Sequence, residues 1–135
     1  TQFWHPTPVE RDSASLQAFK RKLQKVMWKG AGPLRTESGL KEALTELKAL
    51  GSELDRISLA KPGKFALSLF EKLEAANMLK VSEAIVLGAL ERKETRGAHV
   101  RLDYDETLSQ PSSYSYVLNE AGDWVVTEVP LPAGS

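Results

Sequence analysis

The sequence contains no cysteine. That absence excludes a disulfide framework, a thiol nucleophile and a thiolate metal site. Only two histidines are present, and without cysteine they do not indicate a zinc site. A chain of 135 residues can bury roughly two-thirds of its unfolded surface, so it needs neither a disulfide nor a metal in order to fold. The length predicts one domain with an appendage.

The sequence also carries no net charge. Eighteen basic residues balance eighteen acidic ones, whereas a dedicated nucleic-acid binder is usually basic, so we expect no nucleic-acid partner. Basic residues do surround one helical apolar stripe, and such a helix can contact a membrane or a partner. We interpret them as a solvated face, because lysine stems cover apolar surface while the ammonium groups stay in water. They are Lys20, Arg21, Lys22, Lys25 and Lys29.

Long apolar runs and common catalytic motifs are also missing. No run approaches the ~20 apolar residues that cross a bilayer, and no secretory signal pattern opens the chain, so we expect no direct membrane insertion. There is no GxGxxG, P-loop, GxSxG or HExxH sequence. Asp103, Asp105 and Glu106 lack the glycine and the distal glutamate of a calcium loop. We expect no metal, no cofactor and no catalytic residue in this chain alone.

The longest apolar pattern with helical spacing runs from Phe65 to Arg92 and contains no proline. Its apolar residues recur three and four apart, not in alternation. Further apolar residues fall between these positions, whereas a surface helix would be apolar on one side only. The pattern therefore predicts a central helix that contacts two or more partners. The main positions are Leu69, Leu73, Ala76, Met78, Leu79, Ala84, Leu87 and Leu90, with Val81, Ile85, Val86 and Ala89 between them.

Two amphipathic helices are predicted before the central one. Ser13 is a suitable N-cap for the first and Thr36 for the second. Residues 1–10 are predicted to be extended because Pro6 and Pro8 disfavour a helix, and residues 58–64 are predicted to form a turn or short loop. The first stripe is Leu16, Phe19, Leu23, Val26 and Met27, ending at Gly30, Gly32 and Pro33; the second is Leu40, Ala43, Leu44, Leu47, Leu50 and Leu54, with Gly51 as a kink or local end.

Three helices with short connections predict a mainly α fold, an up-down-up antiparallel bundle similar to a spectrin repeat. Beyond residue 103, two stretches rich in β-formers flank a predicted turn at residues 119–123, which indicates a C-terminal β-hairpin. A lone hairpin is marginally stable, so it should pack on the bundle or pair with something outside. We divide the chain into an extended connection (1–12), a three-helix bundle (13–103), and a loop, hairpin and tail (104–135).

Charged and hydrogen-bonding side chains crowd the segment that follows the central helix. Gly97 can take the left-handed conformation just past a helix C-terminus, which would place Arg92 and Arg96 near the last turn, where positive charge suits the helix dipole. Those two arginines would repel each other four apart on a helix unless a carboxylate or a partner lies nearby. The dipole leaves Glu94, His99, Arg101 and Asp103 unexplained, and we expect their side chains to fan toward one surface.

One stretch is distinctive: Arg92, then Glu94-Thr95-Arg96-Gly97-Ala98-His99-Val100-Arg101-Leu102-Asp103. It is accompanied by Leu23-Gln24 and Met27 in the first helix, Arg35 before the second, and Asn77-Met78-Leu79 in the third. Across residues 15–103 these motifs resemble the C-terminal helical domain of the flavoprotein subunits of succinate dehydrogenase and fumarate reductase, which L-aspartate oxidase shares. Thr95 stands where that signature has a serine, and it keeps the hydroxyl.

The resemblance implies a non-catalytic accessory domain of an FAD-dependent succinate dehydrogenase or fumarate reductase-type flavoprotein, whose FAD and dicarboxylate bind mostly in other domains. It implies packing on the flavin-binding domain of the same parent chain, with an iron–sulfur subunit as a further partner. It also implies a cytoplasmic protein held at the inner face of the membrane through partner subunits. We hypothesise that the signature residues form a docking surface that orders the flavin-binding core. They are Arg92, Glu94, Thr95, Arg96, His99, Arg101 and Asp103.

A second class of function stays open, a free-standing helical module whose charged loop binds a protein partner. The chain begins at Thr1 without methionine, on an aromatic and proline-rich segment. We interpret it as an excised domain of a longer protein, with processing or tag removal as the alternatives. The sequence does not separate succinate oxidation, fumarate reduction and aspartate oxidation. A flavin-binding domain encoded ahead of Thr1 would distinguish the accessory domain from the free-standing module.

Overall fold

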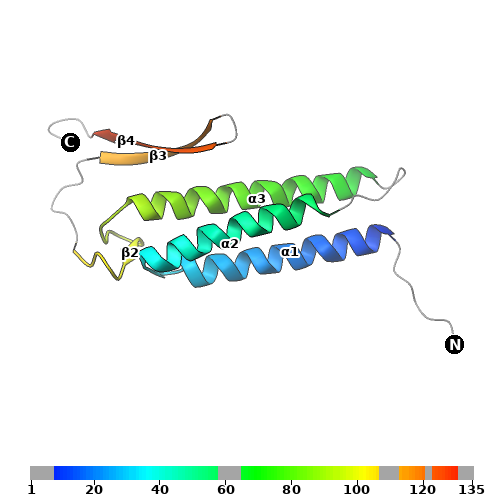
Figure 1. Ribbon diagram of the computed structural model, residues 1–135, viewed down its shortest axis with the longest axis horizontal. Coiled ribbons are helices and arrows are strands. Elements are labelled where there is room, and N and C mark those ends of the chain that lie inside the picture. Colours follow the sequence, from blue (N-terminus) through cyan, green and yellow to red (C-terminus); the bar gives the residue numbers. More distant parts are fainter. Residues whose placement is uncertain (1–7, 58–64, 107–112, 121–122, 131–135) are drawn as a thin grey trace.

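Three helices lie side by side in the computed structural model, which describes residues 8–57, 65–106, 113–120 and 123–130 (Figure 1). They are α1 (Pro8–Ala31), α2 (Glu37–Asp55) and α3 (Phe65–Glu91). Successive helices run in opposite directions (Figure 1), which confirms the mainly α, up-down-up bundle. Within the described ranges, no helix is long and apolar enough to cross a bilayer.

The start of α1 differs from the prediction. The helix begins at Pro8, so Ser13 lies inside it and does not cap it, and residues 8–12 are not extended. Proline suits the first turn because its φ is already helical and its missing N–H would have no intrahelical acceptor there. The extended segment expected for residues 1–7 and the turn expected at residues 58–64 lie outside the described residues.

The connection between α1 and α2 follows the prediction closely. α1 ends at Ala31, beside Gly30 and Gly32. Thr36 is the N-cap of α2, with extended backbone and a side-chain oxygen that accepts a hydrogen bond from the Gly39 N–H at 3.1 Å. This bond satisfies one of the four N–H groups that a helix start leaves without a partner. α2 continues past Gly51 to Asp55, so Gly51 does not end the helix.

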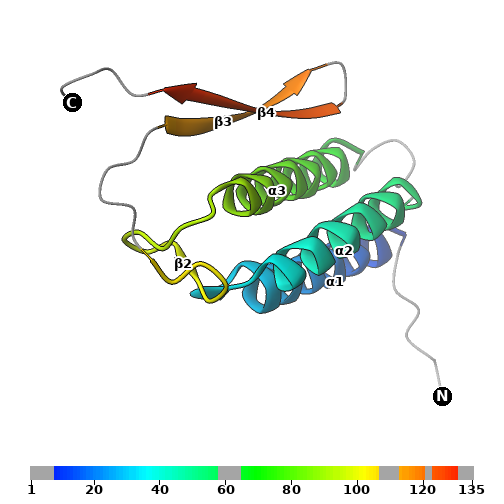
Figure 2. The same cartoon turned by 60° about the vertical axis from the view of Figure 1, so that its left-hand side comes forward.

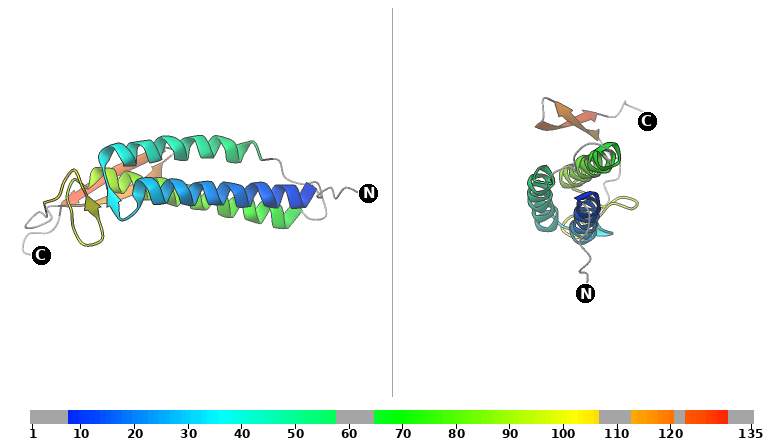
Figure 3. Two further views of the ribbon diagram at one scale, coloured as in Figure 1. Left: turned by 90° about the horizontal axis from the view of Figure 1, so that it is seen from below. Right: turned by 90° about the vertical axis from the view of Figure 1, so that its right-hand side faces the viewer.

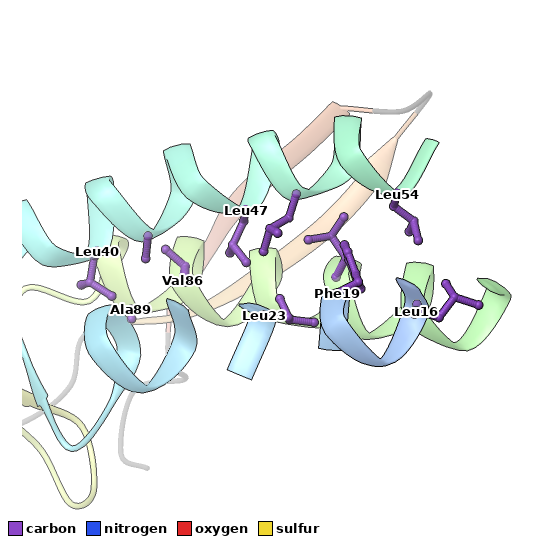
Figure 4. Packing of buried hydrophobic residues seen from close by; sticks show 12 residues of the cluster. Leu16, Phe19, Leu23, Leu40, Leu47, Leu54, Val86 and Ala89 are labelled. Atoms are coloured by element: carbon purple, nitrogen blue, oxygen red, sulfur yellow. The ribbon is translucent and has the colours of Figure 1, made fainter. Parts of the chain in front are cut away.

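The hydrophobic core lies between the three helices (Figure 4). The predicted stripes of α1 and α2 both face it, with Leu16, Phe19 and Leu23 buried in α1. Burying a leucine or phenylalanine side chain stabilises the fold by roughly 1.5–3 kcal/mol, so these rows account for the association of the first two helices. The buried residues of α2 are Leu40, Ala43, Leu47, Leu50 and Leu54.

The buried row of α3 is not the predicted one. α3 contacts both other helices and the hairpin, as expected of a central helix. Among the predicted main positions, however, only Leu79 is buried, and Leu73 is 55% exposed. Apolar residues occupy every face of this helix, so their spacing could not reveal which face is the inner one. The inner row, spaced four and three residues apart, is Ala75, Leu79, Ser82, Val86 and Ala89.

The predicted hairpin is present as β3 (Ser113–Glu120) and β4 (Asp123–Pro130), and it lies along α3 on the side away from α1 and α2 (Figures 1 and 2). Glu120 pairs with Asp123, so residues 119, 120 and 123 belong to strands and not to the turn predicted there. Trp124 of β4 donates its indole N–H to the Glu83 carboxylate of α3 at 2.5 Å. The hairpin therefore packs on the bundle.

A second pair of strands was not predicted. β1 (Leu34–Arg35) and β2 (Val100–Arg101) pair in parallel, with Leu34 opposite Val100 and Arg35 opposite Arg101. Two-residue strands leave no periodic signal in a sequence. Their pairing joins the α1–α2 connection to the segment that follows α3, and so determines where the signature residues lie.

Gly30 lies at a close approach of α1 and α2, which gives a test of the packing. A Cβ at this position would lie 2.5 Å from the Ala43 Cβ and 2.9 Å from the Gly39 carbonyl oxygen. We expect Gly30→Ala to lower the free energy of unfolding by about 1–3 kcal/mol, because overpacking outweighs the better helix propensity of alanine.

Gly51→Ala is the matched control. Its Cβ would meet only the Leu79 Cδ2, at 3.4 Å, so the substitution should be neutral or stabilise the chain by up to about 1 kcal/mol. Urea unfolding of both variants measures the difference. A Gly30→Ala variant as stable as Gly51→Ala would show that the two helices are not packed as described.

Candidate functional site

All seven predicted site residues come together at one end of the bundle, where α3 ends, α2 begins and β1 pairs with β2 (Figure 2). Successive residues of a strand point to opposite faces. Arg101 is fully buried, so its face of the ladder is the inner one. Leu34 is 62% exposed, in keeping with a place on the outer face.

The Arg101 side chain closes the C-terminal end of α3. Its Nη1 donates to the carbonyl oxygens of Ala89 at 2.8 Å and Leu90 at 3.2 Å. The last carbonyls of a helix have no intrahelical partner, and a cation beside them is favoured by the helix dipole. Arg101 therefore acts as a C-cap that arrives from ten or more residues beyond the carbonyls it satisfies.

The same guanidinium forms a two-pronged ion pair with Asp103. Arg101 Nε donates to Oδ1 at 2.9 Å and Nη2 donates to Oδ2 at 2.8 Å. Oδ2 also accepts the backbone N–H of Glu37, the first residue of α2, at 3.0 Å. The hydrogen bonds from Arg101, and then from the Glu37 N–H, hold the pKa of the Asp103 carboxyl well below its usual value. One ion pair thus joins the end of α3 to the start of α2.

Glu94 neutralises the two arginines that were expected to repel each other. Its carboxylate is buried and accepts from Arg92 Nε at 3.0 Å and from Arg96 Nε at 3.3 Å. Burial alone would raise the pKa of this carboxyl, but the charge of Arg96 and the hydrogen bond and charge of Arg92 outweigh it, and the pKa is lowered. Of the two expected ways to relieve the repulsion, a nearby carboxylate or a partner, the structure shows the carboxylate, and Glu94 supplies it from within the segment.

The predicted position of Gly97 was wrong in one respect. Its φ is +58°, in the left-handed region, but α3 ends at Glu91, so Gly97 is not the residue just past the helix. Arg96 and His99 instead exchange two backbone hydrogen bonds, of 2.8 and 3.0 Å. Gly97 is the first residue of the tight turn between them, where a positive φ favours glycine. Arg96 consequently lies outside the last turn of the helix.

His99 is held by both ring nitrogens. Nδ1 lies 3.1 Å from Arg35 Nη1, and Nε2 lies 2.9 Å from the Arg92 carbonyl oxygen. A guanidinium can only donate, so Nδ1 accepts and the proton is on Nε2. Burial, followed by the charges of Arg35, Arg101 and Arg92, lowers the pKa of the imidazole, although the hydrogen bond to the Arg92 carbonyl acts in the opposite direction.

The Thr95 hydroxyl is used in full, which explains why threonine can replace serine here. Its Oγ1 accepts the Arg101 N–H at 3.0 Å and lies 2.8 Å from the Tyr104 carbonyl oxygen, to which it can donate. Tyr104 also places its ring 4.9 Å from the Arg101 guanidinium carbon, a cation–π contact. Neither Tyr104 nor the Arg35–His99 contact was predicted; Arg35 was singled out only as one of the motifs that carry the family resemblance.

The expectation that these side chains fan toward one surface was wrong for Glu94 and Arg101. Both are buried, because the ladder turns Arg101 inward and two arginines enclose Glu94. The same end of the fold exposes two large apolar side chains, Leu34 at 62% and Leu102 at 58%, among exposed charged residues such as Lys93 and Asp105. Within the part of the chain that the structure describes, no cluster of three acidic or histidine side chains could hold a metal ion. We call the hydrogen-bonded network around Arg101, Asp103 and Glu94 the clamp, because it fixes the positions of the exposed residues at this end of the fold.

Removing the Arg101 guanidinium should cost far more stability than removing an exposed arginine. Arg101→Met leaves the α3 carbonyls without donors and Asp103 without its partner, and we expect a loss of about 2–4 kcal/mol in the free energy of unfolding. Arg101→Lys should lose an intermediate amount, because an ammonium cannot form the two-pronged pair. Arg21→Met on the exposed face of α1 is the control. Equal urea midpoints for Arg101→Met and Arg21→Met would contradict the clamp.

His99 should make stability depend on pH near neutrality. Its pKa is below the ordinary 6.5 in the folded chain, so below that pH the unfolded chain binds a proton that the folded chain does not. The contribution is therefore present above pH 6.5 and is lost as pH falls toward the lowered pKa. Unfolding free energies measured between about pH 5 and 7.5 should decline toward acid, and His99→Gln should decline less. An unchanged slope in the variant would rule out this assignment.

Comparison with known proteins adds the family. The family model described as fumarate reductase flavoprotein C-term matches residues 20–126. An uncharacterized FAD-dependent oxidoreductase of Methanocaldococcus jannaschii is 36% identical over 88 residues, 65% of this chain and 16% of that protein. The L-aspartate oxidase of Yersinia pestis is 37% identical over 110 residues, 80% of this chain and 20% of the relative.

The fold agrees. The Mycobacterium smegmatis Sdh1 complex in the apo form contains a chain that matches with a TM-score of 0.74 and 26% identity, over 85% of this chain and 20% of that one. This chain therefore spans only a fifth or less of the length of these relatives. With the family model matched over α2, α3 and the signature segment, the chain belongs to the family of fumarate reductase flavoprotein C-terminal domains.

Proposed function

We propose that this chain is the C-terminal accessory domain of an FAD-dependent flavoprotein of the succinate dehydrogenase and fumarate reductase type. It packs on the flavin-binding core of the same polypeptide, helps to order that core, and has no catalytic activity alone. Family membership supports the parent, since the matched segments make up only 16% and 20% of the length of two relatives.

The docking role rests on one observation. The end of the bundle that holds the signature residues, which we call the signature end, has a buried face and an exposed face. On the inner face, Arg101 and Glu94 are buried and hydrogen-bonded within the chain. On the outside, Leu34 and Leu102 expose more than half of their surface. These two are neighbours, because the Leu102 N–H donates to the Arg35 carbonyl at 2.7 Å. Adjacent exposed leucines held on a rigid support are typical of a surface that another polypeptide covers.

The charged signature residues take two roles in this proposal. Arg101, Asp103, Glu94, Thr95 and His99 set the shape of the surface from within. Arg92 and Arg96, whose side chains are 39% and 32% exposed, lie at its border, and the exposed part of Arg92 can donate to carboxylates or carbonyls of the covering polypeptide. The interface is thus an apolar centre with a polar rim, as is usual for a surface that docks on another domain.

The parent's other properties follow from the same assignment and are part of the proposal. FAD is bound by the flavin-binding core and not by this chain. An iron–sulfur subunit is a further partner of the parent. Attachment to the inner face of the cytoplasmic membrane is peripheral and depends on partner subunits.

Placing a charge in the apolar centre tests the docking role in the full-length parent. Leu102→Asp should lower the flavin-to-protein ratio and turnover, because an unpaired carboxylate buried at an interface costs about 2 kcal/mol or more. Thr45→Asp is the control, since Thr45 is a polar exposed residue of α2. Absorbance of purified protein gives the flavin content, and thermal unfolding of the chain alone shows that both variants still fold.

Full flavin content and turnover in Leu102→Asp would contradict the docking role. A reading frame with no flavin-binding segment ahead of residue 1 would contradict the parent itself and would favour a free-standing interaction module.

A further inference from the structure

A second exposed apolar surface runs along α3, and the signature network does not account for it. We define the α3 outer stripe as Phe70, Leu73, Asn77, Val81 and Ile85. Its four apolar members are 75%, 55%, 59% and 45% exposed in that order. The spacings of three and four residues place all five on one side of the helix. That side is opposite the buried row that begins at Ala75.

The stripe is long and carries no charge. Phe70 and Ile85 are fifteen positions apart, which is about 22 Å along a helix. Single exposed apolar residues are normal, but a contiguous row is not. α2 shows what a water-facing row looks like in the same bundle, because its exposed positions at equivalent spacing are polar: Lys41, Thr45, Lys48, Ser52 and Asp55.

The other described elements leave this side of α3 open. In the right-hand panel of Figure 3, α2, α1 and the hairpin occupy three sides of α3, and no described element covers the fourth. The hairpin is held to a different face, through Trp124 and Glu83. An occupant must therefore come from outside the residues that the structure describes.

We propose that the α3 outer stripe is the seat of a segment of the parent polypeptide that precedes this chain, and that this segment presents an apolar face to it. The inference rests on the proposed function and extends it to a second surface. The chain spans 16% to 20% of its relatives, and a C-terminal family places the remainder upstream. Helices α1 and α3 run in the same direction (Figure 1), so polypeptide that joins α1 arrives at the Phe70 end of the stripe.

The stripe also leads into the signature end. Gly88 lies between Ile85 and the helix terminus, and the Arg92 N–H still donates to its carbonyl at 3.2 Å. Arg92 thus continues the helical row beyond the stripe, with its guanidinium held by Glu94 at 3.0 Å. An upstream segment seated on the stripe would meet a donor at its far end, so its expected chemistry is an apolar face that terminates in a carboxylate or carbonyl.

Two other occupants fit the residues less well. A lipid surface favours helices with basic residues on the flanks of the apolar face, whereas the exposed charges next to this stripe are mixed: Glu74, Lys80 and Glu91. Glu74 is moreover paired with Lys20 of α1 at 3.4 Å. A second copy of the chain would have to compete with an upstream segment that is covalently attached and therefore at high effective concentration.

Cysteine accessibility tests the occupant, and the absence of native cysteine makes the chain suited to it. Val81→Cys places a thiol in the stripe, and Thr45→Cys places one on the polar exposed row of α2 as the control. Each variant is treated with a water-soluble maleimide, once as the 135-residue chain and once in the full-length parent, and modification of that residue is followed by peptide mass spectrometry. We expect Cys modification at position 81 to be about tenfold or more slower in the parent, and modification at position 45 to differ by about twofold or less.

The outcomes separate the possible occupants. Equal reactivity at position 81 in the chain and in the parent would overturn the inference. Slow, concentration-dependent reactivity in the chain alone, together with a dimer in sedimentation, would assign the stripe to a second copy and overturn it. Protection that appears only with phosphatidylcholine–phosphatidylglycerol vesicles would assign it to lipid, with the same consequence.

Failure here is distinguishable from failure of the proposed function. If Leu102→Asp lowers flavin content while position 81 stays reactive in the parent, the accessory role stands and the stripe is not its seat. If position 81 is protected but Leu102→Asp leaves the flavin content unchanged, the stripe does contact the upstream segment, but the domain does not help to order the flavin-binding core.

Discussion

The ion pair between Arg101 and Asp103 is the interaction on which the rest of this structure depends. Each partner also hydrogen-bonds the end of a different helix: the guanidinium donates to carbonyls at the end of α3, and the carboxylate accepts an N–H at the start of α2. Positive charge at a C-terminus and negative charge at an N-terminus both suit the helix dipoles, so one pair is favoured by two helices at once. The parallel β1–β2 ladder, the turn at Gly97 and the His99–Arg35 contact all hold this pair in position. The main role of the signature residues in this structure is therefore to stabilise the fold, and by doing so they fix the exposed residues at the same end of the bundle.

The third helix is packed on one side and exposes apolar side chains on another. Its inner row, from Ala75 to Ala89, meets α1 and α2, a flank meets the hairpin through Glu83, and its outer row faces water with apolar side chains. Burial of apolar surface is the main favourable term in folding, and the apolar side chains on the outer row of α3 stay exposed and do not contribute to it. A free-standing domain would replace Leu73 and Val81 with polar residues at little cost, as α2 does at Lys41 and Thr45. The exposed apolar residues of α3 and the hydrogen-bonded signature residues are the two observations on which the proposed docking role rests.

Much of the fold was predictable because its signals are local. Thr36 as N-cap, the leucine row of α2 and the two β-rich stretches of the hairpin depend on residues within a turn or two of each other. Two features depend on contacts between distant residues and were missed, and one local feature was misinterpreted. The inner face of α3 could not be chosen while apolar residues filled every face. Arg101 was known to be charged, but its burial depends on Arg35, sixty-six positions earlier, through a ladder too short to show a period. Pro8 was interpreted as a helix breaker, although a proline in the first turn is compatible with a helix.

The most direct measurement is amide hydrogen exchange at Glu37 by NMR. This N–H is at the first position of α2, where no intrahelical acceptor exists, and its partner is the Asp103 carboxylate, 66 residues away. The account predicts that it is protected in the native chain and loses that protection in Asp103→Ala, while the Gly39 N–H, bonded to Thr36, keeps its own. A Glu37 N–H that exchanges at the rate of an unstructured amide, or that is indifferent to Asp103→Ala, would contradict the claim that this ion pair joins the two helices.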